Sequence, residues 1–272
     1  MSDLSLLHRQ LAHWQEHGEI PMSNGNEHIV SENPYSVTLR RSSVKAGPRM
    51  VQAESMLEYD FFCVLDFDPR VEKYKEQPVS IPWRTPEGQH RRYTPDVLVK
   101  FLPFEGSAEH QRLKSAIYEI KPYAKLVEDW PKLRPKYRGV QKSLDGTHVP
   151  FKVVTEKRLR PAFVKNVHFL LDYDARHLYH GTHLSNEQAD RMRAISAQIR
   201  LGVPTTPRRM LDNITKDAFT QALHVPWIWH LLRTGNLQAD LIEPLTVDTE
   251  IWPSFIKHPR AKWMTKEYDW YC

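Results

Sequence analysis

The stretch YTPDVLVKF at residues 93–101 decides the fold, together with SAIYEIK at residues 115–121. The first stretch alternates, and both are rich in β-branched and aromatic residues, so each predicts a β-strand. A basic, proline-interrupted helical stretch follows over residues 125–143, and residues 149–155 predict a third strand. Strand, helix and strand in this order predict an α/β core built on a mixed sheet.

These strands carry charged residues at informative positions. Alternate residues of a strand share a face, so Glu119 and Lys121 point to one side while Ile120 packs on the other. Asp96 lies next to the neighbouring strand, so its carboxylate and that of Glu119 can lie close enough together to bind one metal ion. Oxygen ligands suit Mg²⁺ or Mn²⁺, which lowers the pKa of a bound water and offsets charge on a reacting phosphate, while Lys121 can hold that water. The pattern predicts a phosphodiesterase site, although a Glu-x-Lys pair alone is weak, since exposed strands carry such pairs routinely.

A further acid, Glu58, is expected upstream, in the middle of an otherwise apolar helix that ends before Pro69. Glu58 follows Glu54 by one helical turn, and two acids at this spacing repel each other unless a cation or water separates them. One interpretation makes Glu58 a metal ligand supplied by this helix. The other makes it a solvent-facing helix residue.

Basic residues gather in two stretches that contain no acid, residues 34–53 and residues 131–144. The chain of 272 residues has 38 Lys and Arg against 33 Asp and Glu, a formal charge of +5, which permits a polyanionic partner without requiring one. Each stretch is either a surface that contacts DNA phosphates or an ordinary solvated surface. The residues expected to contact DNA are Arg40, Arg41, Lys45, Arg49, Lys132, Arg134, Lys136 and Arg138.

The sequence changes character near residue 174, where we place a domain boundary. Residues 4–16 and 161–174 predict helices of the first domain, residues 1–174. The second domain, residues 175–272, is expected to be mostly helical. Its expected elements are a helix opened by a capping box of Ser185 and Gln188, short helices over 219–223 and 226–234, and a hairpin over 237–245. Helices followed by a hairpin predict a winged-helix-like module.

Composition excludes several classes of protein. The two cysteines, Cys63 and Cys272, exclude a disulfide scaffold and a zinc site built from cysteine pairs, and Cys63 is expected in the core. The first residues lack the pattern of a signal peptide, and no run approaches the roughly 20 apolar residues of a membrane span. We therefore expect a soluble, intracellular protein without a membrane partner. No glycine-rich phosphate loop indicates ATP hydrolysis by the chain itself.

An ordered set of motifs resembles one known family. ESMLEYDFF around Glu58, EQP at residues 76–78, YTPD at 93–96 and YEIKP at 118–122 are similar to the TnsA endonuclease family. These proteins are the restriction-endonuclease-like subunits of heteromeric cut-and-paste transposases. The segment LLRTGNLQADLIEPLT at 231–246 resembles the winged-helix carboxyl-terminal domain of longer members.

The resemblance implies a Mg²⁺-dependent DNA endonuclease on a restriction-endonuclease-like core, with Mn²⁺ as a substitute. Glu58, Asp96 and Glu119 would hold the metal, the Ile120 carbonyl would add an oxygen, and Lys121 would orient the water. Some members carry glutamine where Glu119 stands, so the acid here is closer to the general restriction-enzyme pattern. Such a subunit cuts the 5′, non-transferred strand of double-stranded DNA at transposon ends, beside a DDE transposase subunit and an AAA+ ATPase regulator. We expect it to be cytoplasmic and to act at the nucleoid.

Two alternatives stay open. The chain is also compatible with a stand-alone restriction-like or junction-resolving endonuclease, which would cut DNA without partners. It is compatible, too, with a non-catalytic adaptor whose second domain binds DNA or a protein and whose acids are surface residues.

Overall fold

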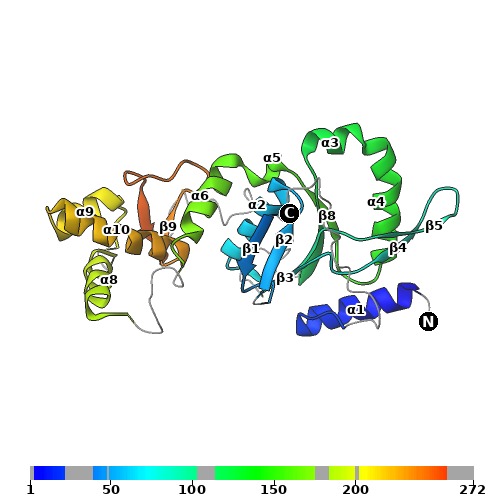
Figure 1. Cartoon of the computed structure of the whole chain (residues 1–272), viewed down its shortest axis with the longest axis horizontal. Helices are drawn as coiled ribbons and strands as arrows, with labels where there is room; N and C mark the ends of the chain where they lie inside the picture. Colours follow the sequence, from blue (N-terminus) through cyan, green and yellow to red (C-terminus); the bar gives the residue numbers. More distant parts are fainter. Residues whose placement is uncertain are drawn as a thin grey trace. The chain divides into compact units, whose positions relative to one another are not determined.

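The computed structural model describes residues 3–21, 39–47, 49–102, 114–174, 184–199 and 202–255. The chain divides into two compact units, Met1–Leu159 and Arg160–Cys272 (Figure 1). This division lies earlier than the boundary expected near residue 174. The reason is that α6 (Pro161–Leu171) packs on α10 (Ala218–Arg233) within the second unit.

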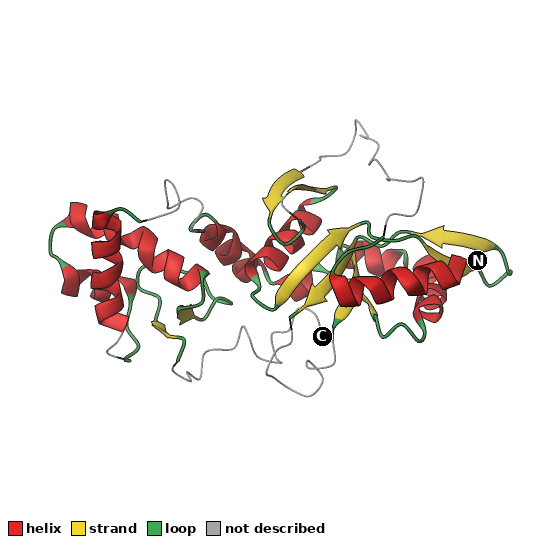
Figure 2. Cartoon of the chain, turned by 90° about the horizontal axis from the view of Figure 1, so that it is seen from below, coloured by secondary structure: helices red, strands yellow, loops and turns green. Residues whose placement is uncertain are grey.

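A four-stranded mixed sheet forms the centre of the first unit (Figures 1 and 2). Its order is β3-β6-β7-β8, and only the last pair, β7 with β8, is parallel. The strands are β3 (Val71–Glu76), β6 (Val97–Phe101), β7 (Ser115–Ile120) and β8 (Phe151–Val154). All six residues of β7 are buried, including the polar Ser115 and the charged Glu119. The mixed α/β sheet expected from the sequence is confirmed.

The single strand expected over residues 93–101 is wrong, because the chain changes sheets inside it. β5 (His90–Tyr93) pairs with β4 (Ile81–Arg84) in a separate two-stranded sheet, and β6 begins only at Val97. Pro95 lacks the N–H that a continuous ladder needs. The N–H of Gln77 donates to the carbonyl of Asp96 at 2.9 Å, which fixes the crossing.

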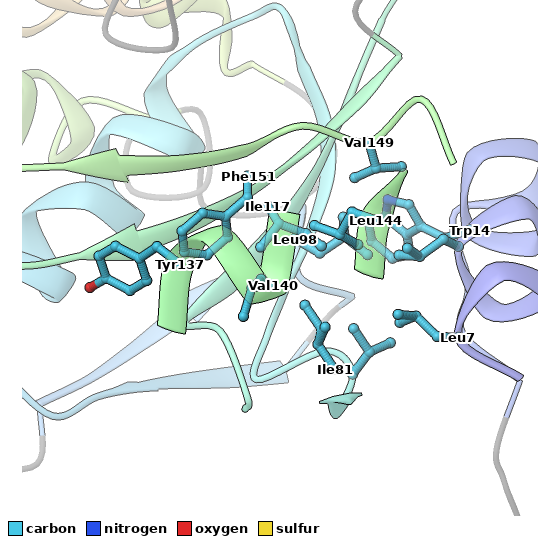
Figure 3. Close-up of a cluster of buried hydrophobic side chains, with 12 residues drawn as sticks. Leu7, Trp14, Ile81, Leu98, Ile117, Tyr137, Val140, Leu144, Val149 and Phe151 are labelled. Carbon is cyan, nitrogen blue, oxygen red and sulfur yellow. The ribbon is translucent and has the colours of Figure 1, made fainter. Parts of the chain in front are cut away.

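Five described helices belong to this unit. They are α1 (Asp3–His17), α2 (Met56–Phe67), α3 (Tyr123–Glu128), α4 (Trp130–Leu144) and α5 (Glu156–Leu159). All but α3, which has no buried residue, contribute to the core. Figure 3 shows Leu7 and Trp14 of α1 meeting Ile81, Ile117 and Val140 in one apolar cluster. The amphipathic helix expected at residues 4–16 is therefore a core element of the first unit.

The basic stretch expected as an arm or a polar loop forms an antiparallel hairpin in its described part. This hairpin pairs β1 (Leu39–Ser43) with β2 (Arg49–Ala53), and both strands contact α2. Val51, Ala53 and Ser43 are buried there. Val51 and Ala53, which follow Arg49, and the buried Ser43 thus attach this stretch to the body of the unit.

The second unit is mostly helical. Its remaining elements are α8 (Asn186–Ile199), α9 (Pro207–Ile214), β9 (Leu237–Ala239) and β10 (Ile251–Pro253). The capping box at the start of α8 is confirmed, since the Ser185 N–H donates to Gln188 Oε1 and the Gln188 N–H donates to Ser185 Oγ.

Two expected elements of this unit are wrong. The short helices at 219–223 and 226–234 form one helix, α10, which runs through Pro226. The hairpin expected over residues 237–245 does not form. Instead, β9 pairs with β10, which follows it after a longer connection. Asn166 holds that connection by donating to the carbonyls of Leu241 and Glu243.

Cys63 is buried, as expected, and Cys272 lies outside the described residues. None of the described helices combines the length and apolar character needed to cross a membrane.

Candidate active site

The sheet register brings Asp96 and Glu119 together. Val97 pairs with Tyr118, so the residues that precede and follow them, Asp96 and Glu119, lie opposite each other and on one face of the sheet. Asp96 Oδ2 accepts a hydrogen bond from the backbone N–H of Ile120 at 2.5 Å. The carboxylate of Asp96 is thereby fixed at the end of β7.

Two tyrosine hydroxyls hold the carboxylate of Glu119, which is only 7% exposed. Tyr93 donates to Oε2, and Tyr137 of α4 donates to Oε1 at 3.1 Å. Both rings also pack against Phe151, with centroids 6.0 and 5.2 Å away. In Figure 3, Tyr137 stands at one end of the apolar cluster with its hydroxyl turned away from it. Glu119 is therefore oriented through both of its oxygens.

The role of these tyrosines was missed from the sequence. Tyr93 stands in the YTPD motif, and Tyr137 is an aromatic residue in an otherwise basic helical stretch. Their convergence on Glu119 depends on the packing of α4 and β5, which local patterns do not report.

Glu58 occupies the first turn of α2 rather than the middle of the helix, which corrects its expected position. It forms a capping box: the Ser55 hydroxyl accepts from the Glu58 N–H, while Glu58 accepts from Ser55 Oγ and from the Glu54 N–H, each at 2.9 Å. Both carboxylate oxygens of Glu58 are therefore engaged at the start of α2.

Two lysines accompany the acids. The N–H of Lys121 donates to the Val154 carbonyl at 2.9 Å, extending the parallel pairing beyond β7. Lys136 Nζ lies 4.3 Å from the ring centre of Tyr93 and 5.0 Å from that of Tyr137. Burial lowers the pKa of Lys136, against the charge of Glu119, which raises it.

The acids destabilise one another's charge. Burial, then the charge of Glu119, raises the pKa of Asp96 to about 8, with a smaller contribution from Glu58. Burial also raises the pKa of Glu58. Raised pKa values are expected where carboxylates lie close together and are partly shielded from solvent.

The donor set fits a small, oxygen-preferring cation. Asp96 Oδ1 accepts no hydrogen bond from the described part of the chain, and each carboxylate oxygen of Glu119 keeps a second acceptor position. Mg²⁺ commonly takes one or two protein carboxylates and completes its shell with water and phosphate. Among the described residues, no three His, Cys, Asp or Glu side chains lie close enough together to hold one metal ion. The capping bonds of Glu58 explain why this third acid stands apart.

The basic residues separate into two sets. Arg41 pairs with Asp66 at 2.8 Å, Lys45 donates to the carbonyls of Leu65 and Asp68, and Arg49 pairs with Glu76. These three side chains are engaged within the unit. Exposed positions are held instead by Arg40 on β1 and by Lys132, Arg134 and Arg138 on α4, while Lys136 is half-buried beside Glu119.

Residues 68–156 match the model of one protein family, described as the TnsA-like endonuclease N terminal. The match supports a TnsA-type endonuclease family. It spans β3 to β8 and includes Asp96, Glu119 and Lys121, whereas Glu58 lies outside it. A comparison of the whole chain with curated proteins finds no match. The TnsA-like segment therefore coincides with the central sheet and with the acid pair on it, and it is related to nucleases of transposase systems.

Proposed function

We propose that the chain is the Mg²⁺-dependent endonuclease subunit of a cut-and-paste transposase. The observation that carries the proposal is the meeting of Asp96, Glu119 and Lys121 at the end of β7, inside the segment that matches TnsA-like endonucleases. The mixed sheet and its flanking helices support a restriction-endonuclease-like core. The helices of the second unit and the β9–β10 pair support a winged-helix-like module.

The residues divide the work as follows. Asp96, Glu119 and the Ile120 carbonyl would hold the cation, and Tyr93 and Tyr137 keep the Glu119 carboxylate in place. When bound, Mg²⁺ offsets phosphate charge and makes water more acidic. Lys121 orients the attacking water, and Lys136 faces the scissile phosphate from α4.

The substrate and partners follow from the family. We infer hydrolysis of the 5′, non-transferred strand at transposon ends, beside a DDE transposase that processes the 3′ strand and an AAA+ ATPase regulator. The α4 helix contacts Glu119 through Tyr137, and its exposed residues Lys132, Arg134 and Arg138 supply positive charge for the phosphates. The positive surface and the acidic centre support DNA as the substrate.

Strand-resolved cleavage tests the proposal. Transposon-end DNA labelled on each strand is incubated with Mg²⁺, the chain and both partners, and the chain alone is incubated with plasmid. We expect 5′-strand cleavage only in the complete mixture, its loss in Asp96→Asn, and its retention in the control Asp145→Asn, an exposed acid of the same unit. Cleavage of plasmid by the chain alone would favour a stand-alone endonuclease. Persistent 5′-strand cleavage by Asp96→Asn would rule out the assigned site.

A further inference from the structure

The hairpin of β4 and β5 carries a concentration of positive charge that the sequence motifs did not assign. Arg84, His90, Arg91 and Arg92 are all exposed, and Glu87 at the turn is the single acid of residues 81–93. Arg84 lies directly opposite His90 in the register. Alternation along β5 puts Arg92 on the same face as Arg84 and His90, and puts Arg91 on the other face with Tyr93.

The β4–β5 hairpin packs against α4 of the first unit. Its base packs on α4, where Ser143 Oγ donates to the Pro82 carbonyl, and a Cβ on Gly139 would come within 2.9 Å of the Trp83 ring. At its turn, the N–H groups of Thr85 and Gly88 close the backbone through the carbonyls of Gln89 and Thr85. An isolated hairpin is marginal in water, so this docking is what holds the strands in place.

The hairpin also starts at the active site. Tyr93, the last residue of β5, donates to Glu119, and Arg91 lies on the same strand face two residues away. From Tyr93 to His90 the strand reaches about 10 Å at about 3.4 Å per residue, and the turn lies beyond it. The strand alone spans roughly a third of the 34 Å helical turn of B-DNA. Figure 1 shows β4 and β5 extending past the end of α4.

We propose that the β4–β5 hairpin is a DNA-binding element that contacts phosphates flanking the scissile bond through Arg84, Arg91 and Arg92. The inference rests on the proposed function, which makes duplex DNA the substrate. The Arg92 side chain pairs with Asp3 of α1, and both side chains are 58% exposed. An exposed pair of this kind contributes little to stability, so a phosphate can replace Asp3. Within the described residues, the Arg91 side chain donates to Gln89 Oε1 at 2.8 Å, and this contact is exposed.

Salt-dependent DNA binding tests the proposal. The full chain is titrated, without divalent metal, against a fluorescent duplex of arbitrary sequence at several salt concentrations. For the variant R84Q/R91Q/R92Q we expect a shallower salt dependence of DNA binding. The negative slope of log association constant against log salt concentration should lose about 2–3 of its magnitude, at about 0.9 per lost phosphate contact. The affinity loss should be equal for unrelated sequences, because phosphate contacts carry no sequence information.

Two matched variants separate DNA contact from a structural role. Asp3→Asn breaks the same ion pair from the other side but keeps Arg92, so we expect unchanged or tighter DNA binding. If the pair only holds α1, Asp3→Asn and Arg92→Gln will weaken binding alike, and the proposal fails. Arg193→Gln, which removes an exposed, ion-paired arginine of the second unit, should leave the slope unchanged. Should the triple variant not fold, Arg91→Gln and Asp3→Asn carry the test.

An unchanged slope in the hairpin variants would overturn the proposal. So would a result in which DNA affinity is kept and binding to the partner transposase is lost, because the hairpin would then face an acidic protein surface. If wild type itself does not cleave, the proposed function fails, while the salt slope still decides whether the hairpin binds DNA.

Discussion

Replacing Asp96 by asparagine should stabilise the protein when no divalent metal is present. Burial and the charge of Glu119 raise the pKa of Asp96 from its ordinary 3.8 to about 8. The folded chain therefore binds this proton more tightly than the unfolded chain does. Asparagine has nearly the same shape, can still accept from the Ile120 N–H through its amide oxygen, and carries no charge in either state.

The size and sign of the effect follow from linkage. Because the folded pKa is raised, the stabilising influence of protonation is complete below pH 3.8 and is lost as pH rises toward about 8. At about 1.4 kcal/mol per pKa unit, the free energy lost by pH 7 has an upper limit of about 4 kcal/mol. Asp96 and Glu119 titrate as a pair, which spreads this loss over both groups. We expect Asp96→Asn to raise the free energy of unfolding by about 1–4 kcal/mol at pH 7 and by little near pH 4.

Hydrogen exchange in the full chain measures this effect locally. Peptides from β6 and β7 report the opening free energy of the first unit, with Asp145→Asn as the exposed control. Adding Mn²⁺ should reverse the order, because a ligand at 100 times its Kd stabilises wild type by about 2.7 kcal/mol and the variant by much less. Equal protection of wild type and Asp96→Asn at pH 7, in the absence of metal, would refute the reasoning.

Three further substitutions test the packing and the site. Leu11→Ala in α1 should cost about 2–5 kcal/mol in urea denaturation of the first unit, because Leu11 is fully buried; a loss below about 1 kcal/mol would show that α1 is not a core element. Gly139→Ala should cost about 1–3 kcal/mol in the same assay through its clash with Trp83. Tyr137→Phe removes a hydroxyl from Glu119 and should weaken Mn²⁺ binding about 10- to 100-fold in calorimetry with little change in folding.

The strands and helices of the first unit were predictable wherever the spacing of apolar residues along the sequence is enough to define the element. β7, β8 and α1 follow from their apolar spacing, and the antiparallel return from β6 to β7 places Asp96 beside Glu119. Two acids at neighbouring positions of adjacent strands lie side by side once the strands pair. The proximity of Asp96 and Glu119, with Lys121 next on the same strand face, could therefore be predicted from the sequence.

Features set by distant partners could not be anticipated. Arg41 and Arg49 belong to an acid-free stretch of sequence, yet their acids, Asp66 and Glu76, come from other elements and pair with them. Pro226 looked like a helix start, but burial of the α10 residues that follow it, including Trp227 and Ile228, keeps one continuous helix. Local patterns report neither long-range ion pairs nor tertiary packing that overrides a proline.

The position of the metal tests the central claim most directly. When Fe²⁺ replaces Mg²⁺, ascorbate and peroxide generate radicals that cut the protein backbone beside the bound ion. We expect cuts next to Asp96 and next to residues 119–121, competed by Mg²⁺ and absent from Asp96→Asn. Cuts elsewhere in the chain, or the same cuts in Asp96→Asn, would contradict a metal centre built on Asp96 and Glu119.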